Sequence, residues 1–479
     1  MSLKKQAISS VFWTSLQQFS NQGVSFIVSL SLARLLMPAE FGLIALISIF
    51  ISIGKSLMDV GLNQSLIRSS DVNKEDFDTV FIFNLIGSIT IYILIFLLAP
   101  LISDFYHQPL LTKIVRVYSL VIVINAFDVI QTTQLIKSLK FKTQMKISVP
   151  SLIIGGATGI TLAYNGFGVW SLVWSGIIQS ATAAIQLWFW SDWRPSLNFS
   201  KAKFKEHFHF GYKLTLSSLL DTIFNNIYTI LIGKFFAPAM VGFYNRADTL
   251  KQLPVTNIGS ILNKVTFPLF SKVQHDDVVL KNLYKKLMLL VIYIVAPIIL
   301  FMSALAEPLF RLLFTEKWLP AVPYFQILCW NGILYPIHGY NLNILKVKGR
   351  SDLFLKLEIT KKIIISLMII FSFQFGIYGL LYSSVMFSFV GFFINTYYSG
   401  PFINYKSWEQ IKDIMPTILL ATACAVLIYF FDTHFQTFFH YDFLRLMIGS
   451  MFGVVVYISV SLVFKIQSLI ELINIIKRK

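Results

Sequence analysis

Charged side chains are scarce in this sequence. Asp, Glu, Lys and Arg make up 13% of its 479 residues, while hydrophobic residues reach 56% and aromatic residues 15%. A soluble domain carries about 25% charged residues. Polar blocks long enough to fold separately are also missing, because apolar runs follow one another along the whole chain. The composition therefore excludes a water-soluble fold and predicts a protein whose solvent is lipid.

Sequence features of enzymes and metal proteins are also missing. The only two cysteines, Cys329 and Cys424, lie in apolar segments, so we expect buried packing residues rather than a disulfide framework or a metal site. The seven histidines show no metal spacing and no paired acid, and no Gly-rich loop ends in Gly-Lys-Ser or Gly-Lys-Thr. We therefore expect no catalytic residue, no metal and no cofactor, and predict that the protein is not an enzyme.

The apolar runs are long enough to cross a bilayer as helices, which takes about 17–25 residues. They begin near residues 8, 41, 78, 112, 147, 168, 211, 242, 283, 322, 358, 377, 413 and 443. Polar residues interrupt the first run, and charged residues interrupt the eighth, so neither helix can face lipid all round. The pattern predicts an all-α polytopic membrane protein with about 14 transmembrane helices.

The net charge of +17 comes from Lys and Arg in short segments between the apolar runs. With both termini in the cytoplasm, about 29 of these cations fall on the cytoplasmic side and about 7 on the other, a strong positive-inside bias. Nucleic-acid binding is not expected, because the cations do not gather on one face of a soluble module. We therefore predict a multi-pass protein with both termini in the cytoplasm.

Two sets of residues recur with fixed spacing in the two halves of the chain. The first half has Arg34, Pro38 and Gly42, then Lys140 and Gly166; the second half has Lys234, Pro238 and Gly242, then Arg350 and Gly376. The repeat predicts two parallel six-helix lobes, related by an axis along the membrane normal, with two extra helices at the C-terminal end. Two such lobes around a polar cleft are typical of alternating-access carriers.

The repeat and the charge pattern together predict the domain organisation. We expect an N-lobe at 1–190 with helices 1–6, a cytoplasmic connector at 191–210, a C-lobe at 211–397 with helices 7–12, helices 13 and 14 at 398–464, and a basic amphipathic tail at 465–479.

Ionisable residues at membrane depth are costly, and each is a candidate functional residue. Lys55 and Asp59 lie four residues apart on one helix, so a local ion pair is the alternative interpretation. Asp128 and Asp221 have no partner nearby in the sequence. We interpret these acids, together with Asp248, as candidates for ion or proton coupling.

The helix that begins near residue 242 carries more positive than negative charge. Arg246, Lys251 and Lys264 oppose one acid, Asp248. A cleft lined in this way attracts an anion such as phosphate or pyrophosphate, although Arg246 and Lys251 could instead reach toward an interface. Arg34 and Lys234, in matching positions of the repeat, are predicted at the outer mouth of the cleft.

Four segments resemble the bacterial polysaccharide transporter family, especially the colanic acid exporter type. They are Leu32–Gly42 (LARLLMPAEFG), Asp59–Arg68 (DVGLNQSLIR), Gly166–Val173 (GFGVWSLV) and Ile232–Ala247 (IGKFFAPAMVGFYNRA). That family belongs to the multidrug, oligosaccharidyl-lipid and polysaccharide flippase superfamily. The resemblance extends from the first helix to about Lys362.

The resemblance implies a flippase of the bacterial inner membrane that moves undecaprenyl-pyrophosphate-linked oligosaccharides outward for surface polysaccharide assembly. It also implies a two-lobe cavity in which Lys55, Arg246 and Lys251 receive the pyrophosphate. The expected partners are this substrate, membrane lipid, and a polysaccharide polymerase with its chain-length partner; the protein itself is expected to be a monomer.

Two alternatives stay open. A multidrug or cation antiporter of the same superfamily would more naturally have twelve helices and an acidic cavity. A membrane-embedded polysaccharide polymerase or ligase should have a long external loop with Arg and acidic residues, whereas the longest external connection here is about sixteen residues.

Overall fold

The computed structural model describes residues 3–438 and 441–477, with side chains throughout except at 3–8, 260–265 and 474–477. The described residues form helices and contain no β-strand, which confirms the all-α prediction. Each of the fourteen predicted helix starts lies within a helix or one residue from its first residue. The chain divides into two compact units, an N-terminal unit of residues 1–242 and a C-terminal unit of residues 243–479.

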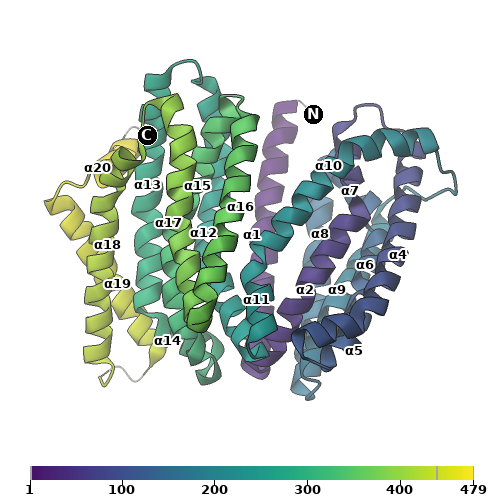
Figure 1. Cartoon of the computed structure of the whole chain (residues 1–479), viewed down its shortest axis with the longest axis horizontal. Helices are drawn as coiled ribbons and strands as arrows, with labels where there is room; N and C mark the ends of the chain where they lie inside the picture. The colour runs from purple at the N-terminus through teal and green to yellow at the C-terminus, as the bar shows by residue number, and fades with distance from the viewer. Residues whose placement is uncertain (1–2, 439–440, 478–479) are drawn as a thin grey trace. The chain divides into compact units, whose positions relative to one another are not determined.

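The N-terminal unit is drawn in purple to teal in Figure 1. Its helices are α1 (Leu3–Leu35), α2 (Pro38–Asp59), α3 (Leu62–Arg68), α4 (Lys74–Tyr106), α5 (Leu110–Tyr118), α6 (Leu120–Ala126), α7 (Val129–Lys137), α8 (Phe141–Tyr164), α9 (Val169–Trp190), α10 (Lys201–Asn225), α11 (Ile227–Phe235) and the first residues of α12 (Pro238–Lys272). Helix α8 packs against α1 and α9, and α10 packs against α2, α3 and α4.

The C-terminal unit contains the rest of α12 and a helical bundle drawn in teal to yellow (Figure 1). Its elements are α13 (Asp277–Ala304), α14 (Ala306–Phe314), η1 (Glu316–Ala321), α15 (Val322–Val347), α16 (Ser351–Ser372), η2 (Phe373–Phe375), α17 (Gly376–Ser399), η3 (Gly400–Ile403), α18 (Ser407–Phe435), α19 (Asp442–Val463) and α20 (Gln467–Lys477). Helix α13 lies between α15 and α18, and α15 packs against α17. Cys329 and Cys424 are free and buried, as predicted.

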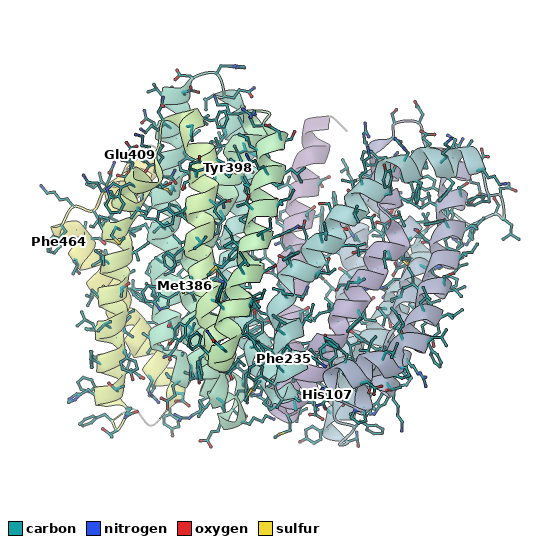
Figure 2. The ribbon with its side chains drawn as sticks, viewed as in Figure 1. His107, Phe235, Met386, Tyr398, Glu409 and Phe464 are labelled. Carbon is teal, nitrogen blue, oxygen red and sulfur yellow. The ribbon has the colours of Figure 1, made fainter. Side chains whose placement is uncertain are left out.

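Eight helical segments of the described chain are long and apolar enough to cross a membrane, and nine if the bent pair formed by α5–α6 and α7 is counted as one span. Many large apolar side chains on these spans point outward, among them Leu97, Ile370 and Met386, each more than 60% exposed; Figure 2 labels Met386. Outward apolar surface on this scale fits lipid rather than water. The prediction of a multi-span membrane protein is confirmed.

The residues of the sequence repeat occupy matching structural positions. Pro38 begins α2 and Pro238 begins α12, where the missing N–H of proline costs no hydrogen bond. Lys140 directly precedes α8, and Arg350 directly precedes α16. The turns that follow these two helices contain Gly166 and Gly376, both with positive φ. The repeat is therefore structural as well as sequential.

The first turns of α2 and α12 meet at two glycines of the repeat. A Cβ added to Gly42 would lie 1.9 Å from the carbonyl oxygen of Pro238, and a Cβ added to Gly242 would lie 2.0 Å from that of Pro38. Each glycine thus faces the backbone of the other repeat, and only hydrogen fits between them. This reciprocal contact fixes how closely the two helices approach.

Helix α10 crosses the end of α2 in a similar way. Gly61, which has a φ of +69°, lies against Gly211, and a Cβ on Gly211 would lie 2.1 Å from the carbonyl oxygen of Val60. The predicted boundary at residue 210 falls inside α10, which continues without interruption from Lys201 to Asn225. The close crossing brings the middle of α10 beside α2 and α3.

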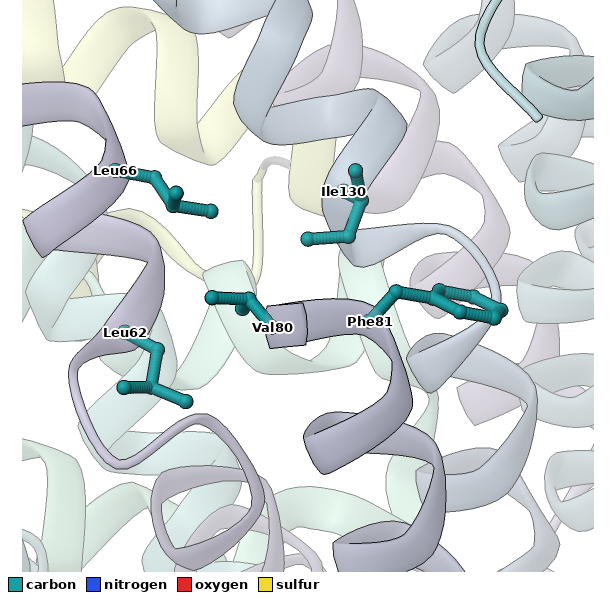
Figure 3. Packing of buried hydrophobic residues seen from close by; sticks show 5 residues of the cluster. All are labelled: Leu62, Leu66, Val80, Phe81 and Ile130. Carbon is teal, nitrogen blue, oxygen red and sulfur yellow. The ribbon is translucent and has the colours of Figure 1, made fainter. Parts of the chain in front are cut away.

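A buried apolar cluster holds the same region together. Leu62 and Leu66 from α3 face Val80 and Phe81 from α4 and Ile130 from α7 (Figure 3). Four of the five side chains are fully buried, the fifth, Phe81, is 5% exposed, and together they come from three different helices. Burial of a side chain of this size stabilises a fold in water by about 1.5–3 kcal/mol. The cluster fixes α3 and α7, which carry residues of the candidate site.

Candidate functional site

A polar pocket of about 410 Å³ lies within the N-terminal unit. The residues that line it come from the end of α2, the start of α3, the break between α6 and α7, and the middle of α10. They are Lys55, Ser56, Met58, Asp59, Gly61, Asn63, Gln64, Asn125, Asp128, Val129, Leu214, Thr215 and Ser218. We call this the Lys55 pocket. It brings together three of the residues predicted from the sequence: Lys55, Asp59 and Asp128.

Lys55 and Asp59 do not form the local ion pair that was the alternative interpretation. Among the salt bridges of the described residues, none joins these two side chains, and Lys55 instead interacts electrostatically with Asp128. The carboxylate of Asp59 accepts a hydrogen bond of 3.1 Å from the backbone N–H of Asn63 in the first turn of α3. Asp59 therefore shapes the turn, while Lys55 remains exposed in the pocket.

Asp128 stands at a break in a membrane-crossing segment. Helices α5–α6 and helix α7 are bent by 45° relative to each other, and Asp128 directly precedes α7. The N-terminus of a helix carries partial positive charge, and broken helices at membrane depth are typical of ligand and ion sites in transporters. The amide oxygen of Asn63, also in the lining, is buried without a hydrogen-bond partner. The pocket therefore offers both charge and unused hydrogen-bonding capacity.

Arg246 and Lys251 of α12 are buried within the C-terminal unit rather than extended toward an interface. Lys251 is 3% exposed, and its Nζ lies 2.5 Å from an oxygen of Asp248. Arg246 is 8% exposed, and its guanidinium lies 4.9 Å from the ring centre of Phe314 and 5.1 Å from that of Trp318. Cation–π contacts of this kind are strongest when the cation is desolvated. These two cations are therefore held by protein groups.

The other predicted residues lie apart from the Lys55 pocket. Asp221 and Arg34 are exposed, on α10 and at the end of α1. Lys234 donates a hydrogen bond of 2.7 Å to the carbonyl oxygen of Phe105 and lies over the ring of the same residue, close to His107, which Figure 2 labels. The side chain of Lys264 lies outside the described residues. In the described chain, no group of three or more His, Cys, Asp or Glu side chains could hold a metal ion.

Sequence reasoning missed a buried polar relay. The expectation that no histidine has a paired acid is wrong for His207, whose Nε2 lies 3.1 Å from Asp76 while its Nδ1 lies 2.8 Å from the hydroxyl of Ser65. The Nζ of Lys203 lies 3.1 Å from the carboxylate of Asp76, and the hydrogen bond that it donates there raises the pKa of Lys203. His207 lies 131 residues from Asp76 in the sequence, so no local signal could reveal the pair.

The relay has the residue types of the catalytic triad of a hydrolase, but its side chains are buried between helices rather than open to a substrate. Ser65, Asp76 and His207 are at most 5% exposed, which keeps substrate away from the hydroxyl. Nucleophilic catalysis requires a reacting atom within reach of the serine. We interpret the relay as an attachment of α10 to α3 and α4.

The sequence is similar to proteins of polysaccharide biosynthesis. It is 25% identical over 354 residues to the teichuronic acid biosynthesis protein TuaB of Bacillus subtilis (strain 168), with 74% of this chain and 73% of the relative covered. It is 26% identical over 367 residues to the lipopolysaccharide biosynthesis protein WzxC of Escherichia coli (strain K12), with 75% and 74% covered. The succinoglycan biosynthesis transport protein ExoT of Rhizobium meliloti (strain 1021) is 25% identical over 336 residues, with 69% and 67% covered.

The fold is similar to two solved transporter structures. A structure described as lipid II flippase MurJ in an inward closed conformation superposes with a TM-score of 0.69 and 14% identity, over 96% of this chain and 100% of that one. An inward-facing multidrug resistance transporter of the MATE family superposes with a TM-score of 0.61 and 15% identity, over 85% and 98%. These likenesses establish a common fold. The family model described as polysaccharide biosynthesis protein matches residues 31–323, more than half of the chain, and the protein therefore belongs to that family.

Proposed function

We propose that this protein is a flippase that moves lipid-linked oligosaccharide units across the bacterial cytoplasmic membrane by alternating access. The substrate is a glycan joined through pyrophosphate to undecaprenol, and its export supplies surface polysaccharide assembly. The relatives named for teichuronic acid, lipopolysaccharide and succinoglycan biosynthesis support this class of substrate. Within the chain, the proposal depends on one observation, the polar Lys55 pocket beside a membrane-spanning helix.

Lys55 supplies the charge that a pyrophosphate needs. An intramembrane cation that faces a polar pocket instead of lipid is a default ligand for an anion. Asp128, with which Lys55 interacts electrostatically, also lines the pocket, but no salt bridge joins the two among the described residues, so the ammonium keeps hydrogen-bond donors for substrate oxygens. Arg246 and Lys251 serve as a second basic group in this proposal, and Arg34 and Lys234 mark the outer mouth.

The proposed topology has fourteen spans with both termini in the cytoplasm. The eight or nine strongly apolar segments are then joined by helices that carry more polar residues, among them α1, α10 and α12. The repeat corresponds to two six-helix lobes at 1–190 and 211–397 in this proposal, and the helices at 398–464 stand outside it. The strong positive-inside bias of the connections supports this orientation.

A cation antiporter is the second candidate, because the Lys55 pocket also contains Asp59 and Asp128. In that case the two carboxylates carry the function, by binding a cation or proton in exchange for a drug. The fold alone does not separate the two functions, since a MATE transporter shares it. In the flippase proposal, Asp128 instead balances Lys55 when substrate is absent and acts in ion or proton coupling.

The first experiment changes the charge of Lys55 in a strain that lacks the chromosomal gene. We expect Lys55→Met to reduce surface polysaccharide at least tenfold, because one charge-assisted contact is worth about 1.5–3 kcal/mol. Lys55→Arg, which keeps the charge, should retain most export. Lys113→Met, which removes an exposed cation on α5, is the matched control, and immunoblots of membranes establish equal protein level. Full export by Lys55→Met would refute the role of this pocket.

A second comparison separates the flippase from the antiporter. Drug resistance conferred on an efflux-deficient host, with no effect on surface polysaccharide and loss in Asp128→Asn, would establish the antiporter. For α12, the single change Lys251→Met leaves the carboxylate of Asp248 without its ion pair, so the pair Lys251→Met and Asp248→Asn must be tested together. Export restored by the double variant would assign Lys251 to structure alone; a loss that persists supports substrate contact.

A further inference from the structure

A second polar pocket lies in the N-terminal unit and is not used by the proposed transport function. It has a volume of about 450 Å³ and is formed by α7 with the residues that follow it, the end of α9 with the residues that follow it, and the segment around the start of α4. Its polar lining includes Gln131, Lys137, Lys140, Asp192 and Trp193. We call it the Gln131 pocket. Ligand pockets commonly enclose about 300–1,000 Å³.

The side chain of Gln131 gives the strongest indication of a ligand. Gln131 is fully buried, yet neither its amide oxygen nor its amide nitrogen has a hydrogen-bond partner. The indole N–H of Trp193, in the same lining, is also buried without a partner. Native proteins rarely leave such groups unsatisfied, because each loses its hydrogen bonds to water without replacement. The pocket therefore offers three N–H donors, two on the Gln131 amide and one on the Trp193 indole, and one acceptor oxygen to a bound group.

The charge around these groups is positive. Lys137 donates hydrogen bonds to the carbonyl oxygens of Leu66, at 2.8 Å, and Ser69, which fix the position of its ammonium group. Lys140 is exposed at the rim, and Asp192 is the acid of the lining. Two cations against one carboxylate favour an anion, and the donors of Gln131 and Trp193 suit phosphate oxygens. The amide oxygen of Gln131 suits a hydroxyl donor on the same ligand.

The depth of the pocket indicates where that ligand comes from. Helix α9 is a membrane-spanning segment that ends at Trp190, and the pocket is lined by its last turn and by Ser191–Trp193 just beyond it. The end of a span, with a half-exposed tryptophan, lies at headgroup level. Leu135, Leu187 and Phe77 supply an apolar wall beside the polar groups.

We propose that the Gln131 pocket binds the headgroup of an anionic phospholipid that carries hydroxyl groups, of the phosphatidylglycerol type. The phosphate lies against Lys137, Lys140 and the Trp193 N–H, and a glycerol hydroxyl donates to the amide oxygen of Gln131. Basic pockets between membrane helices at this depth are suited to anionic headgroups. The proposal is independent of the transport substrate, because the residues of the Lys55 pocket take no part in it.

The test uses the purified full-length protein in detergent and short-chain lipids as probes. Dioctanoyl phosphatidylglycerol should raise the unfolding temperature and bind more tightly than dioctanoyl phosphatidylcholine. Gln131→Leu and Trp193→Phe should each weaken binding about tenfold, the effect of losing a hydrogen bond to a charged group. Lys140→Ala should reduce the preference for the anionic lipid, while Lys113→Ala, which removes an exposed cation outside the pocket, should leave binding unchanged.

Folding defects do not obscure this result. Gln131→Leu removes an unpaired buried amide, so its unfolding temperature without lipid should equal or exceed that of the wild type. Glycerol 1-phosphate tests whether the acyl chains matter: equal stabilisation by this soluble compound would assign the pocket to free polyol phosphates and overturn the lipid proposal. Equal binding of phosphatidylcholine, or wild-type affinity in Gln131→Leu, would overturn it as well.

Discussion

The reciprocal glycine contact between α2 and α12 gives a quantitative prediction. In Gly42→Ala, the new methyl group would lie 1.9 Å from the carbonyl oxygen of Pro238, whereas ordinary contact begins at 3.4 Å, so the two helices must separate by about 1.5 Å or distort. Overpacking costs about 1–3 kcal/mol or more, and a rigid backbone places this site at the upper end. Replacing a helical glycine returns about 1 kcal/mol. We therefore expect a net destabilisation of about 2 kcal/mol.

Thermal unfolding of the purified protein measures this effect. Gly23→Ala is the matched control, because Gly23 also lies in a helix but a Cβ there would meet no atom within 4 Å. It should be neutral or slightly stabilising. Gly242→Ala should be about as damaging as Gly42→Ala, whereas the double variant should cost clearly less than the sum, since one separation of the helices relieves both clashes. Gly42→Ala with the stability of Gly23→Ala, or strict additivity, would refute the reciprocal contact.

Three further predictions concern buried groups. Arg445→Ala should destabilise the protein by about 3–5 kcal/mol in thermal unfolding, because it leaves Asp432 as an uncompensated buried charge. In the wild type, the Arg445 guanidinium donates to the two carboxylate oxygens of Asp432 at 2.9 and 2.6 Å. An unchanged unfolding temperature would show that the pair is solvated. His207→Ala should lower the free energy of unfolding by about 2 kcal/mol, whereas His209→Ala, on the exposed face of the same helix, should leave it nearly unchanged. Equal effects of the two changes would contradict the buried relay. Cys329 should react with maleimide only after denaturation, since burial excludes reagent and solvent; rapid labelling of the folded protein would place it on an accessible surface.

The features that could be predicted from the sequence are those set by local pattern. The length of the apolar runs predicted the helices, because a segment in lipid must form its backbone hydrogen bonds internally. The proline and glycine positions of the repeat were also informative. Pro38 and Pro238 fit the first turn of a helix, which needs no backbone N–H from them, and Gly166 and Gly376 take a positive φ that other residues rarely adopt.

The contacts between distant segments could not be predicted. Lys55 has Asp59 four residues away, yet it interacts with Asp128 from a helix more than seventy residues later. The break that places Asp128 in the pocket falls inside one continuous apolar run, which carries no proline or glycine at that point. Sequence spacing measures proximity along one helix and says nothing of which helices pack together. The polar groups of the candidate site are arranged by that packing.

Helix α10 has a mechanical consequence. It connects His207, anchored in the polar relay, with Thr215 and Ser218 in the wall of the Lys55 pocket, and it does so without a break. Eight residues of helix separate His207 from Thr215, a distance of about 12 Å along a stiff rod. Because a continuous helix moves as one body, a ligand that displaces Thr215 or Ser218 also displaces His207 relative to Asp76 and Ser65. By thermodynamic reciprocity, the factor by which a bound ligand weakens the His207 contacts equals the factor by which loss of those contacts changes the affinity of the pocket.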